Sequence, residues 1–178
     1  MPTDFNLSNL NTQKGDFLNL IQRLNDPSIP DRLINLKLQS TEGPIPDTLE
    51  IIEAVHTSEV DIAIEASGKL GVAGLLIAAA GLKKSRKATY DAIFKLSTLT
   101  EEEGKKKKSK DPYTSCIIET LVNLGAKRWD LIELISSQSY ITATDAKKLR
   151  IIDDAGIVKS KYNNKNKANT TVASQATT

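Results

Sequence analysis

The hydrophobic pattern of the first half of the chain predicts two helices and two strands. Five apolar residues at helical spacing predict a helix that ends at Asn25-Asp26-Pro27; they are Phe17, Leu18, Leu20, Ile21 and Leu24. Residues 33–38 alternate apolar and polar side chains, which predicts a strand, and residues 40–44 predict a turn. A second helix is expected over residues 46–56 and a second strand over residues 60–65. Such alternation is typical of an α/β protein.

A glycine-spaced turn followed by an apolar helix stands at the centre of the chain, in residues 67–81. Gly68, Gly71 and Gly74 recur at steps of three, and residues 75–80 are wholly aliphatic. This run predicts a helix that is buried on all sides, and it is too short to cross a bilayer. In α/β proteins a strand, a glycine turn and a buried helix often carry a nucleophile or an anion-binding helix end.

The second half of the chain adds short strands, helices and two charged segments. Residues 83–87 are basic and predict an exposed loop, and residues 88–96 predict a pair of strands. The charge block, EEEGKKKKSK in residues 101–110, predicts a surface loop. Three further helices are expected over residues 113–124, 129–135 and 144–149.

The two ends of the chain are polar. Residues 1–14 are rich in asparagine and are expected to be loosely ordered. The low-complexity residues 159–178 are expected to be a disordered tail. Residues 15–158 then form a single domain that is long enough to bury a core. No basic stretch followed by an apolar run opens the sequence, so no signal peptide is expected.

Composition limits the chemistry that the chain can perform. A net charge of +2 argues against nucleic acid or a membrane as the main partner, and the lysines of the charge block lack interleaved aromatic residues. The single cysteine, Cys116, excludes an intramolecular disulfide and a cysteine-rich zinc site, and it fits a cytoplasmic protein. Any histidine-dependent mechanism must use the single histidine, His56. Neither a cofactor nor a metal site is predicted.

Three segments match a known pattern in their order and spacing. Residues 37–45, KLQSTEGPI, align with Y-I-N-S-P-G-G-S-V, and residues 68–81 align with G-Q-A-A-S-M-G-A-F-L-L-x-A-G. Residues 140–146 and 149–153 align with F-x-S-A-x-E-A-x-x-Y-G-L-I-D. In these segments the chain resembles the Clp protease proteolytic subunit family, ClpP. The resemblance implies a single α/β domain built as a spiral of β-β-α units, the ClpP/crotonase fold, and assembly into seven-membered rings.

The positions that match the family's catalytic residues carry other side chains. The family's serine nucleophile matches Val72, its histidine matches Ser97, and its aspartate matches Gln138. A serine nucleophile needs a neighbouring base, and that base needs an orienting group. None of the three residues can play its part, so the resemblance implies a lost triad and no enzyme activity. The backbone N–H groups of Gly43 and Ala73 match the family's oxyanion hole, which needs no particular side chain.

Two further departures from the family concern assembly. The resemblance implies that the chain begins after the family's N-terminal axial loop and first strand, which argues against a Clp ATPase as a partner. The segment between Ser97 and Gln138 is shorter than the family's and contains the charge block. Because that segment holds the handle that joins two rings, its length argues against ring stacking. The partners that remain are further copies of this chain in a heptameric ring, or an active ClpP paralogue.

Other pairs of residues in the sequence are candidates for a nucleophile and its base. Ser67 and Lys69 form a candidate serine–lysine dyad, but side chains at i and i+2 rarely face each other in a turn. Lys95 and Ser97 would share a face of a strand, but a solvated lysine stays protonated. The single cysteine and the single histidine lie on different predicted helices. The simpler interpretation of that pair is a buried cysteine and a surface histidine.

Three functions remain open from the sequence. The first is a catalytically inactive ClpP-like subunit of the ClpR type, with a structural or regulatory role in a protease ring. The second is an active, ATP-dependent Clp-type serine peptidase whose catalytic residues lie elsewhere in the chain. The third is a crotonase-like acyl-CoA enzyme. It is disfavoured because the chain is short and because Glu65, on a strand, is the only acidic residue expected close to the central turn.

Overall fold

The computed structural model describes residues 2–30, 32–96, 112–137 and 140–156. The strands are β1 (Thr3–Asn9), β2 (Leu33–Glu42), β3 (Asp61–Ser67), β4 (Lys69–Leu70), β5 (Arg86–Thr89), β6 (Ile93–Lys95), β7 (Tyr140–Thr142) and β8 (Asp154–Gly156). The helices are α1 (Leu10–Leu24), α2 (Ile45–Thr57), α3 (Val72–Ala80), α4 (Pro112–Asn123), α5 (Arg128–Ser137) and α6 (Ala143–Lys148). The charge block and the predicted disordered tail lie outside the described residues.

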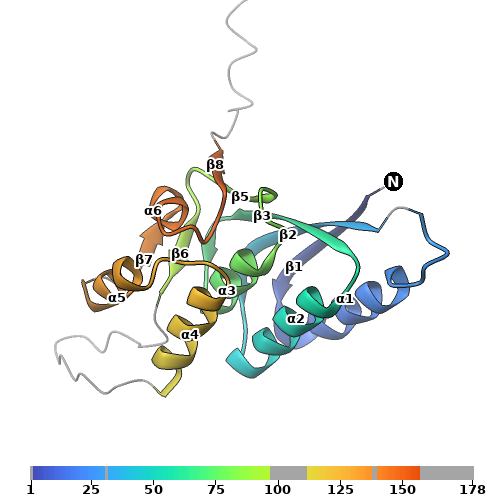
Figure 1. The fold of residues 1–178 in the computed structure, drawn as a ribbon, viewed down its shortest axis with the longest axis horizontal. Helices are drawn as coiled ribbons and strands as arrows, with labels where there is room; N and C mark the ends of the chain where they lie inside the picture. Colours follow the sequence, from blue (N-terminus) through green and yellow to red (C-terminus); the bar gives the residue numbers. More distant parts are fainter. Residues whose placement is uncertain (1, 31, 97–111, 138–139, 157–178) are drawn as a thin grey trace, which may run out of the picture.

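A five-stranded parallel sheet is the frame of the molecule. Its strand order is β1-β2-β3-β5-β8, and every neighbouring pair is parallel. A smaller sheet, with the order β4-β6-β7, combines one parallel and one antiparallel pair. Helices α1, α2 and α3 lie on one side of the larger sheet, and α5 and α6 lie beside the smaller one (Figure 1). The predicted α/β class and the single domain are confirmed.

Helix α3 is the centre of the core, as its sequence predicts. All nine of its residues are buried. Strands β2 and β3 send alternate apolar side chains into the same interior; these are Ile34, Leu36, Leu38, Ile62, Ile64 and Ala66. Successive side chains of a strand point to opposite faces, so the residues between these six lie on the other face of the sheet.

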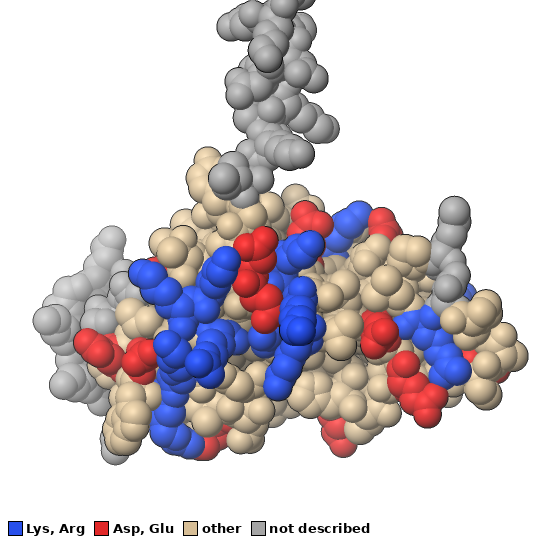
Figure 2. All heavy atoms as spheres, turned by 45° about the horizontal axis from the view of Figure 1, so that its top comes forward, with Lys and Arg blue, Asp and Glu red and all other residues tan. Residues whose placement is uncertain are grey.

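That other face of the larger sheet is polar. A shallow hollow of about 350 Å³ crosses it and is lined by side chains of both charges, among them Asp4, Lys37, Glu65, Lys84 and Lys87. Lys37 and Asp4 form an ion pair at 2.8 Å. Figure 2, in which the top of Figure 1 comes forward, shows basic and acidic side chains interspersed on this surface. Because the charges are mixed, the hollow favours neither an anionic nor a cationic ligand.

The N-terminal residues form regular structure, so the prediction that residues 1–14 are loosely ordered is wrong. Strand β1 pairs in parallel with β2, with Leu7 opposite Leu38. The side chain of Asn9 then caps α1 by accepting a hydrogen bond from the N–H of Asn11 (2.9 Å). Strand β1 forms one edge of the larger sheet.

The sequence signal for this strand was an alternation that the asparagine-rich composition obscured. Phe5 and Leu7 alternate with polar residues, and the Phe5 ring packs against Phe17 of α1 with 5.2 Å between ring centroids. Helix α1 begins at Leu10 rather than near Phe17, because Leu10 is itself buried in the core. Polar residues on the outer face of an edge strand therefore look like a disordered segment when composition alone is considered.

The basic segment of residues 83–87 is only partly exposed, which corrects the prediction of a solvated loop. Its three lysines are exposed, but Arg86 is only 5% exposed. The guanidinium donates hydrogen bonds to both carboxylate oxygens of Asp153 (2.9 and 2.8 Å) and to the carbonyl of Ala79 (3.0 Å). A charge can be buried when it is paired and hydrogen-bonded in this way. The basic sequence did not reveal the distant carboxylate.

The remaining predictions of secondary structure are confirmed within a few residues. The strand pair expected over residues 88–96 corresponds to β5 and β6, and the three later helices correspond to α4, α5 and α6. Helix α6 begins with a capping box, in which the side chain of Thr142 and the N3 residue Asp145 each bond to the other's backbone N–H.

Candidate functional site

The turn before α3 is where the sequence predicts a nucleophile or an anion-binding helix end. Strand β3 ends at Ser67, the chain turns at Gly68, and β4 leads to Gly71, the N-cap residue of α3. Gly68 has a φ of 74°, a left-handed conformation that glycine adopts without strain, and its carbonyl accepts a hydrogen bond from the N–H of Ile93 (3.0 Å). Val72 is the first residue of α3 and is only 6% exposed.

The C-terminal end of β2 lies against this turn. The carbonyl of Thr41 accepts a hydrogen bond from the N–H of Gly71 (3.0 Å), which joins the two segments directly. Gly74 packs close to the same carbonyl, because a Cβ atom built on it would lie 3.0 Å from that oxygen. The two predicted oxyanion-hole residues lie close to this hydrogen bond along the chain. Gly43 comes two residues after Thr41, and Ala73 comes two residues after Gly71. The fold therefore brings the segments that carry them together.

The first turn of α3 presents backbone donors to this site. The first hydrogen bond within the helix is donated by the N–H of Leu75 to the carbonyl of Gly71 (3.1 Å). The N–H groups of Val72, Ala73 and Gly74, which we call the α3 cradle, therefore have no acceptor within the helix. The partial positive charge at a helix N-terminus favours an anion or a carbonyl oxygen. The α3 cradle therefore supplies hydrogen-bond donors but no nucleophile.

Glu42 is the residue at this site that sequence reasoning missed. It is the last residue of β2, and a Cβ atom built on Gly71 would lie 2.9 Å from the Glu42 Cγ atom. The acidic side chain therefore lies directly against the N-cap of α3. The expectation that Glu65 is the only acidic residue near the central turn is wrong. Nothing in the sequence indicated the contact, because Glu42 and Gly71 lie far apart along the chain.

The single histidine of the chain lies away from the α3 cradle. His56 is exposed near the C-terminal end of α2, whereas the N-terminal end of α2 follows Gly43 directly. From Ile45 to His56 an α-helix rises about 16 Å at 1.5 Å per residue. The imidazole therefore lies at the end of α2 opposite to Gly43. Ser97 and Gln138, the other two positions that match the family's triad, lie outside the described residues.

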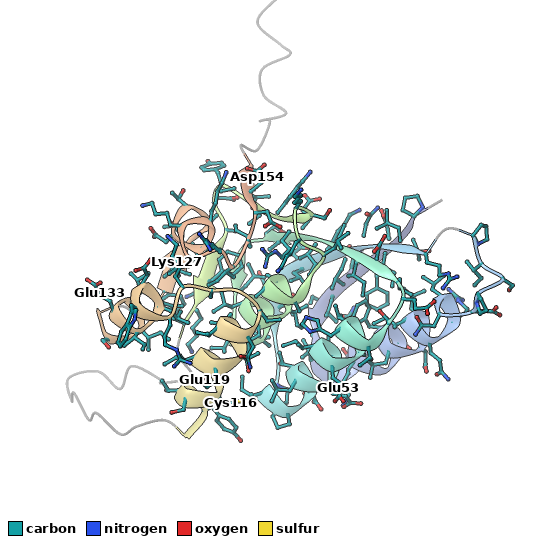
Figure 3. The ribbon with its side chains drawn as sticks, viewed as in Figure 1. Glu53, Cys116, Glu119, Lys127, Glu133 and Asp154 are labelled. Atoms are coloured by element: carbon teal, nitrogen blue, oxygen red, sulfur yellow. The ribbon has the colours of Figure 1, made fainter. Side chains whose placement is uncertain are left out.

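The other candidate pairs are not brought together as catalytic groups. The hydroxyl of Ser67 donates to the carbonyl of Leu38 (3.4 Å), while Lys69 Nζ lies 4.7 Å from the centroid of the Tyr140 ring. The two residues of the candidate dyad thus belong to different sheets and have different partners. Cys116 is half-buried on α4 (Figure 3). No hydrogen bond between it and the histidine occurs in the described part of the chain.

Comparison with known proteins shows a similarity of fold. No model of a known protein family matches the sequence, and no curated protein matches it. Among solved structures, the chain is similar to the ClpP protease catalytic domain from Plasmodium falciparum. The TM-score is 0.68 and the sequence identity is 18%, over 89% of this chain and 86% of that one. The chain has a ClpP-like fold. At this identity the similarity establishes the architecture of the ClpP-like chain and leaves its chemistry to be argued from its own residues.

Among residues 2–30, 32–96, 112–137 and 140–156, no helix is both long enough and apolar enough to span a membrane. The same ranges contain no group of three or more histidine, cysteine, aspartate or glutamate residues that could hold a metal ion.

Proposed function

We propose that this chain is a catalytically inactive ClpP-like subunit of the ClpR type, with a structural or regulatory place in a protease ring. The observation that carries the proposal is Val72, a buried valine at the first position of α3. The resemblance to ClpP assigns this position to the serine nucleophile. An isopropyl group can neither attack a carbonyl carbon nor be activated by a base.

The position of His56 supports the same proposal. A peptidase of the triad type needs an imidazole within hydrogen-bond reach of its nucleophile. The chain has one histidine, and that residue is exposed at the end of α2 remote from the α3 cradle. Loss of a single triad member already costs several powers of ten in rate. A structural role needs only the fold, which this chain retains.

The partners we propose are further copies of this chain or an active ClpP paralogue, assembled in the cytoplasm. The ClpP-like fold favours an oligomer, and a subunit without a nucleophile contributes to proteolysis only beside subunits that have one. Native mass spectrometry of the purified protein, alone and mixed with a candidate paralogue, tests this part of the proposal. A mass near seven chains supports the ring, and a strict monomer under both conditions contradicts it.

We expect the wild-type protein to remain unlabelled by a fluorophosphonate probe. The probe reacts with a serine hydroxyl whose proton is taken by a base, and the described residues assemble no such pair at the start of α3. The Val72→Ser variant should also remain unlabelled, because it gains a hydroxyl without gaining a base. Intact-mass spectrometry after incubation with the probe measures the result, with an active ClpP as the positive control.

Stoichiometric labelling of the wild-type protein would contradict the proposal. In that case Ser67→Ala and Ser97→Ala identify the reactive residue, since these two serines belong to the candidate nucleophile–base pairs of the sequence. Labelling that either variant abolishes would establish a serine peptidase with relocated catalytic residues.

Glu42 favours a second candidate function, acyl-CoA chemistry of the crotonase type. Such chemistry combines backbone donors for a thioester oxygen with a nearby carboxylate as acid or base, and Glu42 lies beside the α3 cradle. Coenzyme A should then raise the melting temperature of the protein by binding the native state. Loss of that stabilisation in Glu42→Gln would support the candidate, and an unchanged melting temperature in the wild-type protein would dismiss it.

A further inference from the structure

A row of alternating charges crosses the face of the larger sheet that α1, α2 and α3 leave uncovered. In the strand register Lys37 of β2 lies beside Glu65 of β3, and Glu65 lies beside Lys87 of β5. Lys87 in turn lies beside Asp154 of β8. Residues paired in this way point to the same face of a sheet, and all four side chains are exposed. The four residues, which we call the charged row, therefore alternate between positive and negative across the sheet.

The charged row is flanked by neutral positions along its central strands. On β2 and β3 the preceding outward-facing pair is Asn35 and Ala63, and the following pair is Gln39 and Ser67. On β5 the next outward-facing residue is Thr89. Charges in these neighbouring positions would blur the alternation, and the described strands have none there. The order of signs along the row is therefore the main electrostatic feature of the centre of this face.

The two central charges of the row are free to meet a partner. Neither Glu65 nor Lys87 forms an ion pair with another residue in the described part of the chain. At the ends of the row, Lys37 pairs with Asp4 of β1 at 2.8 Å, and Asp154 pairs with a lysine of α6 at 3.1 Å. Exposed pairs of this kind are weak, so the two outer charges can also turn toward a partner.

An open face is unusual for a sheet in which every neighbouring pair of strands is parallel, since such sheets are normally covered on both faces. The hollow of about 350 Å³ on this face is lined by side chains of both charges, and Figure 2 shows the two signs interspersed over it. An apolar cover would leave these charges without solvent or partners. A protein surface that covers this face must therefore carry charges of both signs in a matching order.

A second copy of the chain offers such a surface. When two copies meet face to face about a two-fold axis that runs parallel to the strands, between β3 and β5, their charged rows run in opposite directions. Lys37 of each copy then faces Asp154 of the other, and Glu65 of each copy faces Lys87 of the other. A two-fold axis along the row would instead oppose like charges. The first arrangement also keeps the strands of the two sheets aligned to within about 30°, as stacked sheets commonly are.

We infer that this face of the larger sheet binds the same face of a second copy, through four ion pairs between the two charged rows. The contact is isologous, because each copy contributes the same patch. Contacts within a ring join two different patches, so this inference stands apart from the ring proposed above. The row spans three strand spacings, about 14 Å. A contact of this size is weak, and salt should weaken it further.

The first test links the facing groups with a carbodiimide, which joins a carboxylate to a lysine amine as an amide with loss of water. Full-length protein at natural abundance and ¹⁵N-labelled protein are mixed before the reaction, and mass spectrometry identifies the linked peptides. A link between Glu65 of one isotope and Lys87 of the other is expected. A mixed-isotope link between Lys37 and Asp154 is expected as well. The inference is overturned if links form only within single copies.

The second test compares two double variants that have the same net charge. Glu65→Lys/Lys87→Glu exchanges the central charges and leaves every facing pair opposite in sign. Glu65→Lys/Lys37→Glu places like charges against each other in all four facing pairs. Sedimentation velocity over a range of concentrations should show wild-type association for the first variant and association about tenfold weaker for the second. Equal association of the two variants would rule out the proposed order of contacts.

Stability of the folded chain cannot produce this contrast. Within its own sheet the first variant has two positive side chains next to each other, and two negative ones, so its melting temperature should not exceed that of the second variant. Thermal denaturation of both proteins checks this point. A wild-type protein that stays monomeric and gives no mixed-isotope link would show that another protein covers the face, and the inference would fall.

Discussion

Replacement of Arg86 by alanine is expected to lower the free energy of unfolding by about 3–5 kcal/mol, because it leaves a carboxylate without its partner in a mostly buried site. The Arg86 side chain is 6% exposed and that of Asp153 is 26% exposed. The guanidinium also donates to the carbonyl of Ala79, so its loss removes a contact with the end of α3 as well. Chemical denaturation followed by circular dichroism measures the change. A loss below 1 kcal/mol would contradict this account of the pair.

An exposed ion pair provides the control for this prediction. Lys147 and Asp154 interact at 3.1 Å, with side chains 50% and 54% exposed. Solvent-exposed pairs contribute about 0–1 kcal/mol, so Lys147→Ala should be nearly neutral. Comparison of the two variants distinguishes the effect of a buried ion pair on stability from that of an exposed one.

The same pair predicts how stability depends on pH. The hydrogen bonds from the Arg86 side chain hold the pKa of Asp153 below its ordinary value of 3.8, against the opposing effect of partial burial. A carboxyl with a lowered pKa in the folded state stabilises the protein above its unfolded-state pKa. This contribution is lost as the pH falls below about 3.8 and through the folded-state pKa. Asp153→Asn should therefore be less stable than the wild type at neutral pH, and the difference should shrink in acid.

Replacement of Gly74 by alanine is expected to destabilise the protein by about 1–3 kcal/mol, although alanine is the better helix former. A Cβ atom at this position would lie 2.9 Å from the Cβ of Leu70 and 3.0 Å from the carbonyl oxygen of Thr41. Neither neighbour can rotate away, because one atom is bonded to the backbone and the other is part of it. Helix α3 must then move away from the end of β2, which should also disturb the α3 cradle.

Gly15 is the matched control, since it also lies within a helix. A Cβ atom there would meet nothing within 4 Å. Gly15→Ala should therefore stabilise the protein by about 0.5–1 kcal/mol, through helix propensity alone. Thermal denaturation of the two variants against the wild type measures both effects. Opposite signs support the packing argument, whereas equal stabilisation would show that α3 has room at its first turn.

The elements that the sequence predicted well are those whose pattern is set by burial. Helix α3 is apolar at every position except its glycine, and only a fully buried helix accommodates that pattern. Strand β1 was missed because half of its residues face solvent, so a polar composition concealed the alternation of Phe5 and Leu7. Arg86 was misassigned for a related reason. The local sequence shows a run of basic residues. Whether each of these side chains is exposed or buried depends on an acidic partner that only the fold brings close.

In the candidate site, too, the sequence suggested some features and missed others. The oxyanion-hole role of Gly43 and Ala73 stays a prediction; the sequence could suggest it because the role needs only backbone groups, whose geometry follows from the fold that the resemblance implies. Glu42 was missed because its importance comes from a tertiary contact with Gly71. Side chains that meet across segments distant in the sequence are recognised only when both segments have been placed.

The pairing of Arg86 with Asp153 has a consequence for synthesis of the chain on the ribosome. The two residues are 67 positions apart, so Arg86 emerges long before the carboxylate that neutralises it. Until then the arginine must stay hydrated, and strand β5 lacks its neighbour β8 in the sheet. Contacts that close so long a loop form late in folding. A nascent chain that stalls before residue 153 therefore presents an unfinished sheet edge, the state that chaperones and proteases recognise.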